Sequence, residues 1–133
     1  MKYNNSEAIS ELNLQDFAVG NDIVFLPDFS ISFNELFQKK VYTPNEIGYC
    51  KRFDQPLLRY ASTWAAKEAV YKAVKQLYKQ PLAFKNIEIT RSKIAGIPRV
   101  TLPDDFSDLE ISLSITHDGD YACAIAIVKK RYD

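Results

Sequence analysis

One segment of the chain decides the fold, and it reads Trp64-Ala65-Ala66-Lys67-Glu68-Ala69-Val70-Tyr71-Lys72-Ala73-Val74-Lys75-Gln76-Leu77-Tyr78-Lys79. When its residues are placed about 100° apart, as in an α-helix, one side is apolar and must pack on a sheet. That side carries Ala66, Val70, Ala73, Val74 and Leu77, and the opposite side carries Glu68, Lys72, Lys75 and Lys79. We expect the helix to begin near Pro56 and to run to about Lys79, because Pro81 cannot continue it.

Three shorter segments precede this helix. Residues 17–26 read as a buried strand. Ser32-Phe33-Asn34-Glu35 has the pattern of a capping box, which predicts a helix that begins there. Thr43-Pro44-Asn45-Glu46 is a second capping box, with proline at the first helical position, and it predicts another short helix.

Beyond the long helix, apolar residues alternate with polar ones, which is the period of a β-strand. Residues 86–91 and 97–102 form one pair of such segments, with a turn around Ala95-Gly96 between them. Residues 110–117 and 121–128 form a second pair, which the turn Asp118-Gly119 joins into a hairpin. The sequence therefore predicts an α+β fold, in which a strand and three helices precede a mostly antiparallel meander.

The composition limits what the chain can be. Of its 133 residues 47% are apolar, which suffices for one core but not for two domains. We therefore divide the chain into a polar leader, residues 1–16, and a single domain, residues 17–133. The 17 Lys and Arg balance the 17 Asp and Glu, and zero net charge argues against a general nucleic-acid binder.

Neither secretion nor a membrane location is expected. The polar N-terminus lacks the apolar stretch of a secretory signal, and no apolar run approaches the roughly 20 residues that span a bilayer. Two cysteines, Cys50 and Cys123, are too few for a disulfide scaffold, and neither belongs to a CxxC zinc motif. We expect a soluble, cytoplasmic protein.

Three features could carry chemistry. Asp22 lies inside a predicted strand, where aspartate is disfavoured, and Gly20 beside it allows close approach of a ligand or of another backbone. Asp22 is either a ligand-binding carboxylate or one that is bonded to a backbone turn. Glu68, among four lysines of the helix, is either a solvated partner of Lys72 or part of a site for phosphate and metal. His117, the only histidine, either caps the edge of the core or binds a phosphate or carries a proton.

Five short blocks occur in order along the chain. They are Val19-Gly20-Asn21-Asp22, Thr43-Pro44-Asn45-Glu46, Trp64–Lys72, Gly96-Ile97-Pro98 and Ser114-Ile115-Thr116-His117. Their pattern and spacing resemble the 4′-phosphopantetheinyl transferase superfamily, and most closely its short holo-[acyl carrier protein] synthase type. The corresponding family patterns are V-G-x-D, TPxE, [FW]-x-x-K-E-[AS]-x-x-K, G-K-P and S-[IL]-S-H, and the resemblance covers residues 17–128.

The resemblance implies a mostly antiparallel sheet packed against a long helix plus shorter helices. It also implies an activity, the transfer of the 4′-phosphopantetheine arm of coenzyme A to a serine of an apo acyl carrier protein. Adenosine 3′,5′-bisphosphate leaves, and fatty-acid synthesis is the default pathway. By the same match Asp22 and Glu68 would hold Mg²⁺, Lys72 would be the third catalytic residue, and either Glu68 or metal-bound water would assist deprotonation of the serine. The residues that the match assigns to coenzyme A are Lys67, Lys72, Gly96, Pro98, Ser114, Thr116 and His117.

Length gives the resemblance a further implication, a homotrimer with active sites shared between neighbours. The long members of the superfamily join two similar halves, and this chain has the length of one half. In such a trimer His117 would face Asp22 and Glu68 of the partner subunit. Exposed aromatic residues would be candidates for the interface, namely Phe25, Phe29 and Tyr121.

The chain departs from the family at three positions. It has Asn21, Ile97 and Thr63 where Thr, Lys and Arg are usual in the family. Two positive charges near the nucleotide are therefore lost. This loss keeps a second interpretation open, a non-catalytic relative that binds coenzyme A or a carrier protein, and a purely structural oligomer is a third.

Overall fold

The protein is described from a computed structural model, which covers residues 16–91 and 96–131. The predicted leader, apart from Asp16, lies outside the described residues, and so does Ala95 of the predicted turn. Within the described part, no helix is both long enough and apolar enough to cross a membrane.

The order of the elements confirms the predicted α+β class. Strand β1 (Phe17–Phe25) is followed by three short helices, α2 (Leu26–Ser32), α3 (Glu35–Val41) and α4 (Pro44–Cys50). The long helix α5 covers Pro56–Leu77. Two antiparallel pairs complete the fold, β2 (Glu88–Arg91) with β3 (Pro98–Thr101) and β4 (Leu109–Asp118) with β5 (Tyr121–Lys130). Short 3₁₀ turns lie at Phe84–Asn86 and Asp104–Phe106.

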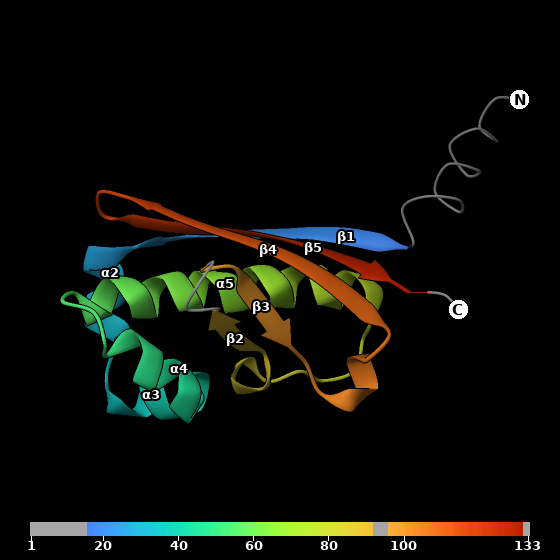
Figure 1. Cartoon of the computed structure of the whole chain (residues 1–133), viewed down its shortest axis with the longest axis horizontal. Helices are drawn as coiled ribbons and strands as arrows, with labels where there is room; N and C mark the ends of the chain where they lie inside the picture. The colour runs from blue at the N-terminus through green and yellow to red at the C-terminus, as the bar shows by residue number, and fades with distance from the viewer. Residues whose placement is uncertain (1–15, 92–95, 132–133) are drawn as a thin grey trace, which may run out of the picture.

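Helix α5 lies in the middle of the molecule (Figure 1). Strands β1, β5 and β4, in that order, form an antiparallel sheet along one side of this helix. Helices α3 and α4 and the pair β2–β3 lie on its other side. Since side chains alternate along a strand, one face of the three-stranded sheet meets α5, and no described element covers the other face.

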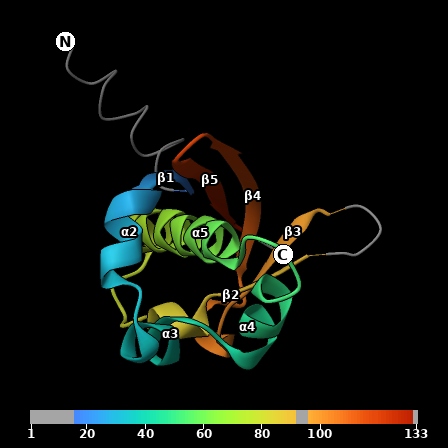
Figure 2. The ribbon, with the colours of Figure 1, turned by 90° about the vertical axis from the view of Figure 1, so that its left-hand side faces the viewer.

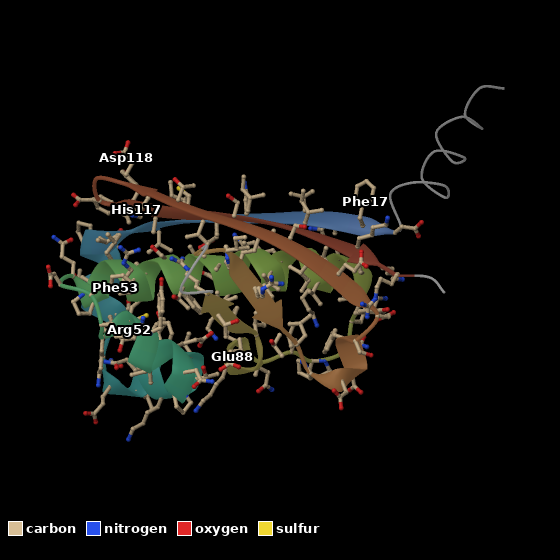
Figure 3. All side chains as sticks on the ribbon, viewed as in Figure 1. Phe17, Arg52, Phe53, Glu88, His117 and Asp118 are labelled. Carbon is tan, nitrogen blue, oxygen red and sulfur yellow. The ribbon has the colours of Figure 1, made fainter. Side chains whose placement is uncertain are left out.

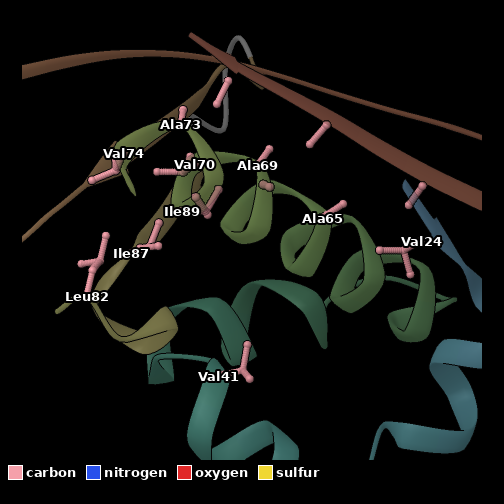
Figure 4. Close-up of a cluster of buried hydrophobic side chains, with 14 of the residues drawn as sticks. Val24, Val41, Ala65, Ala69, Val70, Ala73, Val74, Leu82, Ile87 and Ile89 are labelled. Carbon is pink, nitrogen blue, oxygen red and sulfur yellow. The ribbon is translucent and has the colours of Figure 1, made fainter. Parts of the chain in front are cut away.

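The contact between α5 and the sheet is made by small side chains (Figure 4). Ala65, Ala69 and Ala73 of the helix are completely buried. Strand β1 crosses the helix at Gly20, where an added Cβ would lie 1.9 Å from the carbonyl oxygen of Ala69. Only glycine fits there, which confirms that this position allows the close approach of another backbone.

The structure adds one helix to the prediction and corrects the start of another. Helix α2 is absent from the sequence prediction, although Pro27 lies in its first turn, where proline is well tolerated. Helix α3 is capped by Asn34 and not by Ser32, because the Asn34 side chain accepts a hydrogen bond of 2.8 Å from the backbone N–H of Phe37. The predicted capping box of Thr43 and Glu46 at the start of α4 is confirmed.

Candidate active site

Asp22 lies near the middle of β1 with its side chain toward α5. It is in register with Ala124 of β5, which is buried under the helix. The ammonium of Lys72 donates hydrogen bonds of 2.9 Å to Asp22 Oδ1 and 3.1 Å to the carbonyl oxygen of Asn21. The other carboxylate oxygen, Oδ2, is buried and has no hydrogen-bond partner among the described residues. The carboxylate is therefore bound to a side chain and not to a backbone turn, and one of its oxygens is left for a ligand.

Glu68 lies one helical turn before Lys72, beside the same carboxylate. The pKa of Glu68 is raised to about 7, chiefly by burial. The neighbouring Asp22 carboxylate also raises this pKa, because it favours a proton on Glu68, whereas the positive charge of Lys72 lowers it. The salt bridge of Lys72 is with Asp22 and not, as one interpretation had it, with Glu68. Two carboxylates thus face one another in a half-buried place, an arrangement that favours a bound cation.

Two hollows open beside the carboxylates. One, of about 410 Å³, is lined by Asn21, Asp22, Lys72 and part of β5. The other, of about 450 Å³, has Glu68 in its wall together with an acidic residue and several aromatic side chains, Asp28, Phe25, Phe29, Phe37 and Trp64. Ile23 borders both hollows. The two carboxylates therefore lie where the hollows adjoin.

Lys67 is completely buried, and its surroundings correct the prediction that it binds coenzyme A. Its ammonium forms a 2.8 Å salt bridge with Glu46 and donates to the carbonyl oxygens of Phe84 and Ile87 at 3.0 and 2.7 Å. These three partners use all three ammonium protons. Glu46 also accepts from the backbone N–H of Ile89 at 2.7 Å. Lys67 therefore connects α5 to α4 and to the segment just before β2, and it has no donor left for a phosphate.

Burial acts on this pair in opposite directions. It lowers the pKa of Lys67 and raises the pKa of Glu46, and each charged partner opposes the effect of burial on the other. Each charge is therefore tolerated in the core only because the other is present, since a single buried charge without its partner would strongly destabilise the fold.

The predicted residues of β4 do not meet the carboxylates within one chain. Ser114 is in register with Ile125 and Asn21, so its exposed side chain and that of Thr116 project from the sheet face opposite α5. His117 is exposed near the tip of the β4–β5 hairpin (Figure 3). Across the sheet it is two strands from β1, a separation of roughly 10 Å.

Gly96 and Pro98 lie in another part of the molecule. Gly96 has a φ of 64°, a backbone conformation that favours glycine, and Pro98 begins β3. Figure 2 shows the pair β2–β3 on the side of the molecule away from β1 and α2. Pro98 lines a third hollow, of about 550 Å³, between β3 and β4. Within one chain this region is separate from Asp22 and Glu68.

The uncovered face of the sheet carries an apolar surface that the sequence interpretation did not single out. Val19, Ile23, Ile125 and Ile127 are between 48% and 63% exposed there. The rings of Phe25 and Tyr121 extend this surface, with their centroids 5.0 Å apart. We call these six residues the outer sheet face. Two of the three aromatic residues that were interface candidates belong to it. The third, Phe29, is only 6% exposed, so the prediction that it is an exposed interface residue is wrong.

Comparison with known proteins gives consistent results. Residues 18–126 match the model of the 4′-phosphopantetheinyl transferase superfamily. A holo-[acyl-carrier-protein] synthase of Wolbachia pipientis is 37% identical over 120 residues, which is 84% of this chain and 96% of the relative. Among solved structures, a Chronobacterium ammoniagenes ACPS–CoA complex superposes with a TM-score of 0.75 at 29% identity, covering 87% of this chain and 98% of that one. The Helicobacter pylori holo-[acyl-carrier-protein] synthase in complex with coenzyme A gives a TM-score of 0.70 at 31% identity, with coverages of 84% and 99%.

Proposed function

Because this chain belongs to the 4′-phosphopantetheinyl transferase superfamily, of the holo-[acyl carrier protein] synthase type, we propose that it transfers the phosphopantetheine arm of coenzyme A to a serine of an acyl carrier protein. The relatives named above bear this activity or this ligand in their names, and each matches along nearly its whole length. The observation that carries the proposal is the convergence of Asp22, Glu68 and Lys72, which come from two separate sequence blocks. Fatty-acid synthesis in the cytoplasm is the setting we propose for this reaction.

We propose that Asp22 and Glu68 hold Mg²⁺, because the residues present fit that ion. Asp22 Oδ2 is buried without a partner, and Glu68 beside it is kept partly protonated by burial and by Asp22. Carboxylate oxygens are hard ligands of the kind that Mg²⁺ prefers, and Mg²⁺ is usually held by one or two of them together with phosphate oxygens. The described residues contain no group of three or more acidic, His or Cys side chains that could hold a metal, so phosphate and water would supply the other ligands. When bound, the ion would neutralise charge that develops on the pyrophosphate.

The chain's own residues would contribute charge and position. The ammonium of Lys72 is half-exposed at the edge of the hollow that Asp22 lines, so it can reach a phosphoryl oxygen there. Phosphoryl transfer depends mostly on alignment and on stabilising negative charge, and a lysine beside the carboxylates supplies such charge. Glu68 or a water molecule beside it would accept the proton of the attacking serine.

We propose that the complete site needs a second copy of the chain. Ser114, Thr116 and His117 lie away from Asp22 and Glu68 of their own chain. The outer sheet face is apolar and uncovered, which is typical of a surface that packs against another subunit. A homotrimer joined through this face would bring the exposed residues of one β4 toward the carboxylates of a neighbour.

A non-catalytic relative that binds coenzyme A is the second candidate, and one observation favours it. Thr63, where the family often has arginine, is buried at 4% exposure beside Cys50, with its Oγ1 3.9 Å from the sulfur. A buried threonine cannot provide the positive charge that the arginine would bring to the nucleotide. Ile97, where lysine is usual, is exposed and uncharged.

Incubation with coenzyme A, Mg²⁺ and apo carrier proteins, followed by intact-mass measurement of the carrier, distinguishes the candidates. A gain equal to one phosphopantetheine arm supports the transferase. Binding of coenzyme A without a mass gain on any carrier supports the non-catalytic relative. A protein that neither transfers the arm nor binds coenzyme A would be a structural oligomer, and the proposed function would be wrong.

A further inference from the structure

Lys72 is bound to one oxygen of the Asp22 carboxylate, Oδ1, whereas the other oxygen, Oδ2, is the one left for a metal ion. Its ammonium is 2.9 Å from Asp22 Oδ1, and this carboxylate is one of the two proposed metal ligands. The second contact of the ammonium, to the carbonyl oxygen of Asn21, keeps it on β1 and directs it toward this edge of the sheet. An ammonium on Oδ1 and a divalent cation on Oδ2 of the same carboxylate would lie only a few ångströms apart, and like charges at that separation repel.

The contact of Lys72 is distinctive among the described lysines of α5. Lys75 donates to the carbonyl oxygens of Lys79 and Gln80, near the end of its own helix. Lys67 is enclosed with Glu46 in the core. Lys72 alone of these three binds a carboxylate that borders a hollow, and its side chain is 51% exposed, so packing does not fix its terminal atoms.

We propose that Lys72 is a placeholder cation, which neutralises Asp22 in the metal-free protein and is displaced from it when a divalent metal binds. The displaced ammonium then has its donors free within the same hollow of about 410 Å³, where a phosphate can accept from them. Metal binding thus prepares the phosphate site, and the two ligands bind with positive coupling. This inference rests on the proposed function, since it assumes that Asp22 and Glu68 hold the metal.

Under this proposal Lys72 has two successive partners, a carboxylate before the metal binds and a phosphate afterwards. A lysine that contacted no carboxylate before the metal binds would change the affinity for metal, measured without coenzyme A, only slightly. A placeholder cation instead competes with the metal, so that its removal strengthens metal binding.

Titration of the full-length, substrate-free protein with Mn²⁺, followed by calorimetry and by the electron paramagnetic resonance of free Mn²⁺, tests the inference. We expect Lys72→Met to bind Mn²⁺ about three- to tenfold more tightly than the unaltered protein, the range that corresponds to loss of one exposed ion pair and its repulsion. Lys75→Met is the matched control and should leave the affinity unchanged, because Lys75 donates to carbonyl oxygens and lies over the Tyr71 ring, and it contacts no carboxylate among the described residues. Asp22→Asn should weaken or abolish binding.

The outcomes separate this inference from the proposed function. If the arm is transferred but Lys72→Met binds Mn²⁺ no more tightly than the unaltered protein, the placeholder role is wrong and the transferase stands. If neither the unaltered protein nor Lys72→Met binds Mn²⁺ saturably, both the placeholder role and the metal assignment are overturned. Tighter binding in Lys72→Met supports the placeholder even if no carrier protein accepts the arm.

Discussion

Glu68 has a higher pKa in the folded protein than in the unfolded chain, and this difference makes the stability of the protein depend on pH. Its pKa rises from 4.5 to about 7 on folding, first because of burial and then because of Asp22. Between these two values the folded protein binds a proton more tightly than the unfolded chain does. The free energy of unfolding contributed by Glu68 is therefore fully present below about pH 4.5 and is lost as the pH rises toward 7.

We predict that, without divalent metal, the protein becomes less stable as the pH rises from 5 to 8, and that Glu68→Gln loses part of this dependence. Glutamine keeps the shape of the side chain but cannot titrate. Urea unfolding at several pH values, with and without the substitution, measures the difference. Parallel pH profiles for the two proteins would show that Glu68 is not the titrating group.

The buried pair of Lys67 and Glu46 leads to a second prediction at the same scale. Lys67→Met leaves Glu46 without its cation in the core, and we expect a loss of about 3–5 kcal/mol of stability. Adding Glu46→Gln should recover part of the loss, because the buried charge is then removed as well. The free energy of urea unfolding checks both variants, and a cost below about 1 kcal/mol for Lys67→Met would contradict the structural role described above.

Lys67 and Glu68 also show what the sequence could not predict about single residues, namely which of two adjacent charged side chains faces the site. The resemblance placed both at the active site, but neighbours on a helix point about 100° apart, and only one of them can face the same hollow. The motif does not record burial. The partner of Lys67 is 21 positions away in the second capping box, and the local capping pattern of Glu46 gave no signal of this pairing.

At the scale of elements, periodicity predicted both antiparallel pairs and the long helix, whose end differs from the prediction by two residues. These segments are long enough for their apolar pattern to repeat. Helix α2 is only seven residues long, and proline there was interpreted as the end of a strand and not as the start of a helix. The cap of α3 was misplaced because Ser32 and Asn34 are both good capping residues, and only the fold selects Asn34.

The close crossing of β1 and α5 leads to a prediction about how these two elements pack. Gly20→Ala should cost about 1–3 kcal/mol and shift β1 away from the helix, because the new methyl group meets the backbone at Ala69. That shift would also separate Asp22 from Lys72. Gly48→Ala, in α4, is the control: nothing lies within 4 Å of its added Cβ, so it should be neutral or stabilise by up to about 1 kcal/mol. Thermal unfolding and Mn²⁺ affinity, measured for both variants, check the expectation. The same melting temperature and the same Mn²⁺ affinity in Gly20→Ala and Gly48→Ala would contradict it.

At the scale of the whole molecule, one chain brings together only part of the predicted site. Asp22, Glu68 and Lys72 converge, whereas Ser114, Thr116 and His117 of β4 do not join them. A sequence pattern predicts which residues lie on the same face of a strand, but it does not predict whether the residues of a site come from one subunit or from two. The uncovered outer sheet face is the structural reason for proposing that a neighbour does so.

We predict that the protein sediments as a trimer at micromolar concentration and that Ile125→Lys shifts it toward the monomer. Ile125 is 51% exposed at the centre of the outer sheet face, so a charge placed there would be buried by assembly. Ile31→Lys is the control, because Ile31 is 82% exposed on α2, outside that face. Sedimentation velocity reads the mass of each protein, and a monomeric unaltered protein would contradict the shared site.

The most direct test of the central claim is the initial rate of carrier-protein mass gain in the presence of coenzyme A and Mg²⁺, compared between the unaltered protein and Glu68→Gln. The account predicts transfer by the unaltered protein and a loss of at least about 100-fold in Glu68→Gln, since a metal ligand contributes several kcal/mol to charge stabilisation. Lys75→Gln, on the same helix, should retain the full rate. Full activity of Glu68→Gln, or no transfer by the unaltered protein to any carrier, would contradict the account.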